Sequence, residues 1–254
     1  MKRGFDIAVS LAALIVLAPV FALIAAAIWL SDFQSPFFAG MRVARSDSES
    51  MPCDFRMLKF RTMRPGAWKT GVNSTAADDP RITRLGGFLR RFKLDELPQL
   101  WNVLIGDMSL AGPRPQVRDD ADLYTPEERR MLSVRPGITD LASIVFSDEG
   151  GILAGASDPD LLYNQIIRPW KSRLALLYVD RRSFALDLRI LALTVVAQVS
   201  RRRALAGVAR IVVACDADPR LAEIASRREP LLAYPPPGAE EIARRYPSRR
   251  AHAG

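Results

Sequence analysis

The chain has 254 residues, 49% hydrophobic and 25% charged, so it is long enough for one large domain and too apolar to be disordered. A net charge of +8 favours an anionic partner: nucleic acid, anionic lipid or a phosphorylated substrate. The single histidine, His252, lies near the end, which excludes a histidine triad or a histidine-ligated metal in the body of the fold. Cys53 and Cys215 form neither a disulfide framework nor a zinc-binding spacing, so a reducing compartment is expected. Acid–base or nucleophilic work therefore falls to carboxylate, Lys, Tyr, Ser or Cys side chains.

An uncharged apolar run from Ile7 to Leu30 comes first. It is long enough to cross a bilayer and allows three interpretations: a cleaved signal peptide, a transmembrane helix, or a re-entrant helix that enters and leaves by the same face. Pro19 removes a backbone hydrogen bond in the middle of the run, which predicts a break or a kink in the helix there. Cations flank both ends of the run, Lys2 and Arg3 before it and Arg42 and Arg45 after it. Because cations prefer the cytoplasmic side of a membrane, both ends favour that side. Charge and proline together favour the re-entrant helix, with the spanning helix left open.

The segment 54–63 has the composition of a strand. With a period of two, Lys59 and Arg61 share one face, while Leu58 and Phe60 share the other. Two neighbouring cations of this kind bind phosphates in many proteins, although a solvated strand face is the simpler interpretation.

The segment 80–93 alternates cations with apolar residues. Phe88, Leu89 and Phe92 fall on one helical face, and Arg90, Arg91 and Lys93 lie largely away from it. Such a basic amphipathic segment suits a membrane surface, and an ordinary surface helix is the alternative.

Two adjacent acids, Asp95 and Glu96, precede apolar residues at helical spacing. Pro98 suits the first turn of a helix, so the pattern predicts that Asp95 caps that helix, with Glu96 directly behind it. A helix N-terminus stabilises negative charge and can also hold a phosphate. An acidic cap without a function is the alternative.

Later segments supply further cations and predicted helices. Arg114 stands between two prolines and is pre-positioned to bind phosphate, and Arg135 follows in a Pro-Gly turn. Capping patterns at 125–128 and 157–159 predict two helices, the second interrupted at Pro169. Interface-type residues from Trp170 to Arg181 predict an amphipathic helix, and the run 190–200 is either interfacial or part of the core.

The Arg-rich tail, residues 201–254, differs in composition from the rest of the chain. A short strand is expected at 211–215, followed by a proline-rich linker. Asp216 and Asp218 match the Asp-x-Asp pattern of metal-binding glycosyltransferases, and a loop is the favoured interpretation.

Taken together, five motifs resemble those of the bacterial sugar transferases, the monotopic polyprenyl-phosphate phosphoglycosyl transferases. They span 59–63 (KFRTM), 79–83 (DPRIT), 94–103 (LDELPQLWNV), 106–115 (GDMSLAGPRP) and 135–139 (RPGIT). The resemblance covers residues 1 to about 200 and not the tail. Two features depart from the usual family pattern: Ala18 before Pro19, and the segment 35–42 after the apolar run. Both concern how the chain enters the membrane and not the chemistry.

This resemblance implies a small, mostly helical α/β fold on the cytoplasmic face of the bacterial inner membrane. It implies transfer of a phosphosugar from a UDP-sugar to undecaprenyl phosphate, with release of UMP and a requirement for Mg²⁺. Asp95 matches the nucleophile that forms an aspartyl-phosphosugar, and Glu96 matches a helper that places Mg²⁺ or handles a proton. Phosphate binding is then expected of five cations: Lys59, Arg61, Arg81, Arg114 and Arg135.

The resulting hypothesis divides the chain into a re-entrant helix (1–32), a catalytic domain (33–200) and a basic extension of unknown role (201–254). Interfacial amphipathic helices are expected in the fold, and the expected partners are the sugar donor, the lipid acceptor and membrane lipids rather than nucleic acid; a homodimer stays open. Two alternatives remain. One is a membrane-anchored, non-enzymatic binder of anionic lipid or nucleic acid; the other is a metal-dependent glycosyltransferase that uses Asp216 and Asp218.

Overall fold

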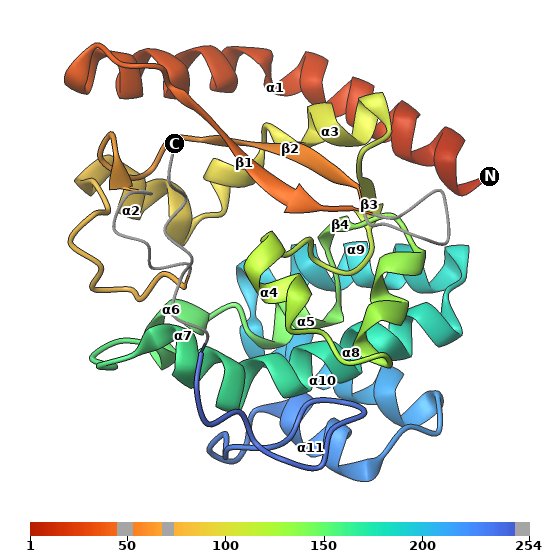
Figure 1. The fold of residues 1–254 in the computed structure, drawn as a ribbon. Helices are drawn as coiled ribbons and strands as arrows, with labels where there is room; N and C mark the ends of the chain where they lie inside the picture. The colour runs from red at the N-terminus through yellow and green to blue at the C-terminus, as the bar shows by residue number, and fades with distance from the viewer. Residues whose placement is uncertain (45–52, 68–73, 247–254) are drawn as a thin grey trace.

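The structure, a computed structural model, describes residues 1–44, 53–67 and 74–246. It is mostly helical with small sheets, as expected, and Figure 1 shows the arrangement. Arg45 and His252 lie outside the described residues. The helices and strands follow one another as α1 (Lys2–Asp32), β1 (Phe37–Val43), β2 (Asp54–Phe60), α2 (Arg84–Arg91), α3 (Gln99–Ile105), β3 (Ser109–Ala111), α4 (Arg118–Asp122), β4 (Gly137–Thr139), α5 (Leu141–Val145), α6 (Glu149–Ile152), α7 (Pro159–Leu162), α8 (Arg168–Arg181), α9 (Phe184–Val199), α10 (Arg201–Ala214) and α11 (Pro219–Ser226).

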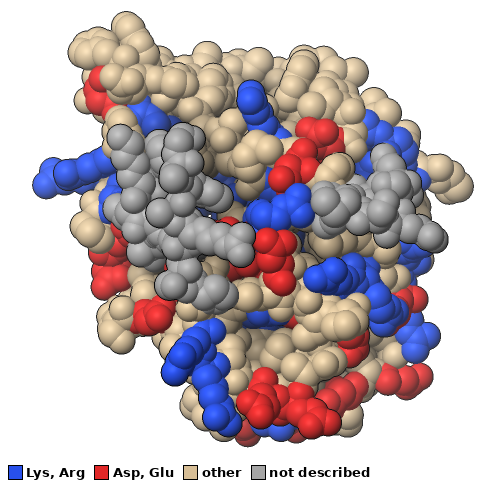
Figure 2. All heavy atoms as spheres, viewed as in Figure 1, with Lys and Arg blue, Asp and Glu red and all other residues tan. Residues whose placement is uncertain are grey.

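Helix α1 is long and apolar enough to cross a membrane. Its most apolar 18-residue stretch has a mean hydropathy of 2.8, and only 11% of that stretch is buried. It runs along one edge of the molecule above β1, β2 and α3, and this edge carries few charged side chains in the view of Figure 2. The expected break at Pro19 is wrong, because α1 continues as a helix through this residue. The kink that Pro19 also allows stays a prediction. A proline removes only one backbone donor, and the turns on either side of Pro19 keep their own hydrogen bonds.

Both ends of α1 are attached to the same body. At the start, Lys2 Nζ lies 2.7 Å from Asp187 Oδ2, and Ser109 Oγ donates to Asp6 at 2.8 Å. At the far end, Arg61 holds Asp32 through two hydrogen bonds of 2.5 and 2.6 Å. The helix therefore lies along the domain instead of projecting from it.

The two sheets are small. Strands β1 and β2 pair antiparallel, and β3 pairs with β4 in parallel. Asn102 attaches α3 to β2, because its amide accepts from Leu58 N at 2.9 Å and donates to Arg56 O at 2.8 Å. Strand β2 ends at Phe60, so Arg61 lies beyond the regular strand, contrary to the predicted extent.

Helices α5, α8, α9, α10 and α11 share the largest hydrophobic core. The interfacial interpretation of α8 is wrong, because Trp170, Leu174 and Tyr178 are buried in this core. The predicted capping box is confirmed. Thr125 N donates to Glu128 Oε2 at 3.0 Å, and Glu128 N donates to Thr125 Oγ1 at 3.1 Å, although the helix that follows is a 3-10 helix, Glu128–Ser133. The second predicted cap is also confirmed, at Asp158 before α7.

The tail contributes to the same core. The strand expected at 211–215 is wrong, since this segment belongs to α10, whose buried residues recur at helical spacing: Ala204, Leu205, Val208, Ile211 and Val212. Beyond α11, the ring of Tyr234 stacks on Trp170 with centroids 4.6 Å apart.

Candidate active site

The acidic pair stands between two helices. Lys93 adopts a left-handed conformation (φ 57°, ψ 19°), which turns the chain out of α2 and into a short 3-10 helix, Leu94–Glu96. Pro98 occupies the N-cap position of α3, so the prediction that Asp95 caps this helix is wrong. Both acids belong to the 3-10 helix, and Leu97 and Pro98 lie between it and α3. The two carboxylates interact with cations from other parts of the chain.

Glu96 is held by two cations from distant segments. Arg114 donates to both carboxylate oxygens, to Oε2 at 3.2 Å and to Oε1 through a second bond, and Lys59 Nζ lies 3.3 Å from Oε1. Burial opposes ionisation of Glu96, but the charges of Arg114 and Lys59 together hold its pKa well below the ordinary value. Burial lowers the pKa of Lys59, against the attraction of Glu96.

Asp95 is less constrained, although it is only 5% exposed. Lys59 Nζ lies 4.0 Å from Asp95 Oδ2, an ion-pair distance too long for a hydrogen bond. The two acids are therefore unequal: Glu96 is fixed by a bidentate arginine, and Asp95 beside it keeps oxygen lone pairs for other partners. A carboxylate of this kind, close to a buried cation, is suited to attack an electrophilic phosphorus.

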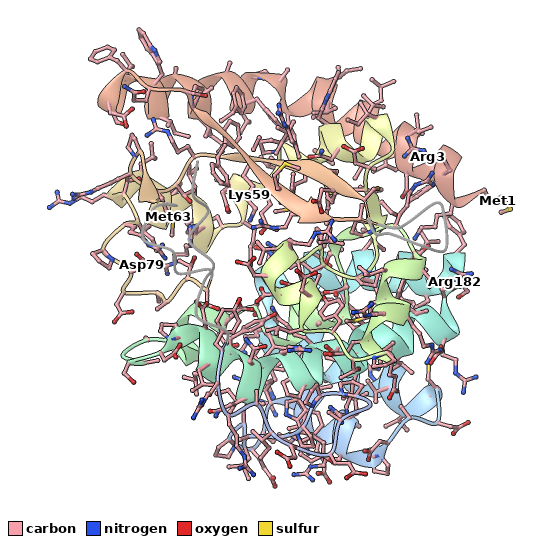
Figure 3. The ribbon with its side chains drawn as sticks, in the orientation of Figure 1. Met1, Arg3, Lys59, Met63, Asp79 and Arg182 are labelled. Carbon is pink, nitrogen blue, oxygen red and sulfur yellow. The ribbon has the colours of Figure 1, made fainter. Side chains whose placement is uncertain are left out.

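The structure separates the predicted phosphate ligands into two groups. Lys59 and Arg114 meet at Glu96, and Figure 3 labels Lys59 beneath α1. Arg61 does not join them, because it pairs with Asp32 and donates to Ser35 O at 2.7 Å. Because Arg61 lies past the end of β2, it does not share a strand face with Lys59 as expected.

Arg81 and Arg135 also have other surroundings. Arg81 lies 2.6 Å from the carboxylate of Asp79, which follows from the two-residue spacing within the motif 79–83. Arg135 lines a separate cleft near the start of α1.

Two further cations near the acids were not predicted as site residues. Burial lowers the pKa of Arg42 to about 10, and the adjacent charge of Arg114 acts in the same direction. Arg90 donates to Thr62 Oγ1 at 2.8 Å. Burial lowers the pKa of Arg90, and the negative charge of Asp95 opposes this shift. Their sequence signal is weak, because Arg42 is one cation on an apolar strand and Arg90 is one of several in a basic helix.

Gln99 is a third residue that the sequence did not single out. It is fully buried in the first turn of α3, and neither atom of its side-chain amide has a hydrogen-bond partner among the described residues. An unpaired buried amide costs free energy, so Gln99 has capacity to bind a further polar group.

A metal would depend on the acidic pair. Within the described ranges 1–44, 53–67 and 74–246, no group of three metal-binding side chains is present. Asp95 and Glu96 nevertheless suit Mg²⁺, which takes one or two carboxylates and completes its shell with substrate phosphates and water. Asp218 instead caps α11 by accepting from Arg220 N at 2.9 Å, so helix capping accounts for the second acid of the Asp-x-Asp pattern.

Comparison with known proteins identifies relatives of this chain. The family model for bacterial sugar transferases matches residues 1–201. The exopolysaccharide production protein PSS of Rhizobium leguminosarum bv. phaseoli is 38% identical over 212 residues, covering 79% of this chain and 96% of that protein.

Two longer relatives have more explicit names. An undecaprenyl-phosphate glucose phosphotransferase of Komagataeibacter xylinus is 34% identical over 80% of this chain and 36% of its own length. A UDP-N-acetylgalactosamine-undecaprenyl-phosphate N-acetylgalactosaminephosphotransferase of Aeromonas hydrophila is 37% identical over 62% of this chain and 36% of its own length. The family match over residues 1–201 and the relatives named as phosphotransferases support an enzyme rather than the non-enzymatic binder. The chain belongs to the bacterial sugar transferase family, as an enzyme of the phosphoglycosyl transferase type.

Proposed function

We propose that this enzyme transfers a phosphosugar from a UDP-sugar to a polyprenyl phosphate such as undecaprenyl phosphate, releasing UMP, as the first membrane step in assembling a bacterial surface glycan. The names of the relatives from Komagataeibacter and Aeromonas support this acceptor and this class of donor. The observation that carries the proposal is the unequal acidic pair, with Glu96 fixed by Arg114 and Lys59 and Asp95 less constrained.

The proposed reaction has two displacements at one phosphorus atom. A carboxylate oxygen of Asp95 attacks the sugar-proximal phosphorus, the bond from that phosphorus to the UMP oxygen breaks, and UMP leaves with the bonding electron pair. A phosphate oxygen of the polyprenyl phosphate then attacks the same phosphorus and releases the Asp95 carboxylate. Dividing the reaction in this way replaces one difficult displacement between two anions by two steps, so the soluble donor and the lipid acceptor use the site in turn.

The chain's own cations would neutralise the charge that develops. Lys59 and Arg114 lie beside the acidic pair, and Arg42 lies close to Arg114, so an entering diphosphate meets positive charge on its non-bridging oxygens. Glu96 would keep Arg114 and Lys59 in place. Mg²⁺ would bind at Asp95 and Glu96, where it supplies charge neutralisation on the substrate phosphates.

We also propose that α1 is re-entrant, bent by a kink at Pro19, and holds the catalytic domain on the cytoplasmic face of the inner membrane. Support comes from its two ends, since Lys2 and Asp32 both form ion pairs with the same domain. A helix attached to one body at both ends is hard to reconcile with a simple crossing. Its exposed apolar side chains would then contact lipid, among them Leu11, Ile15, Val16, Leu23 and Leu30.

Substitution of the nucleophile tests the chemistry. We expect Asp95→Asn to abolish UMP release, because an amide is a poor nucleophile, while the protein stays membrane-bound. In the wild type, intact-mass analysis after addition of Mg²⁺ and a UDP-sugar should reveal a phosphosugar adduct that the variant lacks. Asp180→Asn, at an exposed ion pair with Arg130, is the matched control. Full activity of Asp95→Asn, or release of UDP instead of UMP, would contradict the mechanism.

A further inference from the structure

We propose that a cleft at the start of α1 binds the phosphate of an anionic lipid headgroup, at a site separate from the acidic pair. The cleft has a volume of about 380 Å³ and lies between α1, the segment before β4 and the α8–α9 junction. The inference rests on the membrane association of α1 and not on the chemistry of Asp95.

The charge balance of the cleft favours an anion. Four cations line it, Lys2, Arg3, Arg135 and Arg182, against two carboxylates, Asp6 and Asp187. Both carboxylates are already engaged: Asp187 accepts from Lys2 at 2.7 Å and from Tyr178 at 2.6 Å, and Asp6 accepts from Ser109 at 2.8 Å.

The cations at the mouth of the cleft are available for a ligand. Arg135 and Arg182 are exposed, and neither forms an ion pair or hydrogen bond within the part of the chain that the structure describes. Guanidinium groups bind phosphate through two parallel hydrogen bonds. The N-terminus of α9, a helix of 16 residues, lines the same cleft through Ser183 and Phe184 and adds a favourable dipole.

The location favours a lipid over a soluble anion. The cleft opens where the apolar α1 begins, and Figure 3 places Arg3 and Arg182 at this end of the molecule, apart from Lys59. Phe184 lines the cleft and packs edge-on against Phe5 of α1 with centroids 5.2 Å apart. An acyl chain following α1 would therefore carry its phosphate to Arg135 and Arg182, where surface cations attract anionic lipids.

Native mass spectrometry of the full-length protein in detergent, titrated with phosphatidylglycerol or phosphatidylcholine, tests the site. We expect the wild type to retain phosphatidylglycerol preferentially, and Arg135→Gln/Arg182→Gln to lose this preference by roughly tenfold, in line with two cations near a lipid surface. Arg202→Gln/Arg203→Gln, which removes the same charge from exposed positions on α10, should keep the preference.

Two further measurements distinguish a lipid site from misfolding of the variant and from a site for soluble phosphate. Arg135→Lys/Arg182→Lys should retain part of the preference, which shows that loss in the Gln variant is not misfolding. Inorganic phosphate should not displace the bound lipid at equal concentration; displacement would identify a soluble-phosphate site and overturn the proposal. Unchanged preference in the Gln variant would also overturn it. Asp95→Asn should keep the lipid preference whatever its transfer activity. A failure of the lipid-site proposal can therefore be distinguished from a failure of the proposed function.

Discussion

Glu96 organises the charges of the active site. Its carboxylate is 11% exposed and joins Arg114 from the segment after β3 to Lys59 from β2. Removing one partner from a buried ion pair leaves the opposite charge desolvated and unpaired. Glu96 is thus both a structural anchor and the group that keeps two substrate-facing cations in position.

We expect Glu96→Gln to lower the free energy of unfolding by about 3 kcal/mol, the lower end of the range for breaking a buried pair, because Arg114 and Lys59 retain some solvent contact. Thermal unfolding in detergent measures this change. Asp180→Asn should cost less than about 1 kcal/mol, since Asp180 and Arg130 are about half exposed. Equal stability of the two variants would mean that Glu96 does not anchor the site.

The same pair predicts a pH dependence. The pKa of Glu96 is depressed on folding, so its contribution to stability is complete above its ordinary value of 4.5 and is lost as pH falls through the lower folded value. The difference in unfolding temperature between wild type and Glu96→Gln should therefore be constant from about pH 5 to 7 and narrow below about pH 4.5. A difference that widens on acidification would contradict this assignment.

At the scale of elements, α2 is placed by close backbone contact. A Cβ on Gly86 would lie 2.0 Å from the carbonyl oxygen of Thr62, whereas one on Gly87 would meet nothing closer than 4.0 Å. Thr83 caps the helix by accepting from Gly86 N at 2.9 Å, and Arg90 reaches Thr62 Oγ1. These contacts hold α2 against Thr62, and the acidic pair follows α2 after the left-handed Lys93.

These neighbouring glycines form a matched pair of test positions. Gly86→Ala should destabilise the protein by about 1–3 kcal/mol and lower activity, because the backbone near Thr62 must shift. Gly87→Ala should stabilise it by about 0.5–1 kcal/mol, because alanine is favoured in a helix and space is available. Thermal unfolding measures the stability of the two variants, and UMP release measures their activity. Similar effects of the two substitutions would show that the Thr62 contact does not position α2.

At the scale of the whole molecule, the attachment of α1 decides the topology. Its two ends lie far apart along one edge of the molecule, yet both bind the same domain. The tail is equally integrated, because α10 and α11 complete the core around Trp170 and Leu174. A truncation at residue 200 would expose this core, so a truncation after Ser226 is the better test of what the remaining tail contributes.

Cysteine labelling tests the topology. Gly4 and Gln34 are exposed and lie near opposite ends of α1. In a background without Cys53 and Cys215, we expect Gly4→Cys and Gln34→Cys to react with a membrane-impermeant maleimide from the same side, the cytoplasmic one, in inverted vesicles. Labelling from opposite sides would establish a spanning helix and contradict the re-entrant proposal.

The sequence by itself determined the capping box at Thr125 and the long apolar helix, because each depends on neighbours within a few positions. The catalytic residues that it named stay a prediction. It also indicated the family, since the motifs follow in order along the chain. Two of its local errors share one cause: Pro19 and the segment 211–215 carry signals that longer helices override through their other hydrogen bonds and buried faces.

Only the tertiary structure decided which cations meet the acidic pair. Arg61 and Lys59 are two residues apart, yet one binds Asp32 of α1 and the other binds Glu96. Arg114 and Arg135 lie in similar proline-containing turns, yet only Arg114 reaches Glu96, and Arg135 lines the cleft at the start of α1. An ion pair forms where folding brings opposite charges within about 4 Å, and separation along the sequence does not fix that distance.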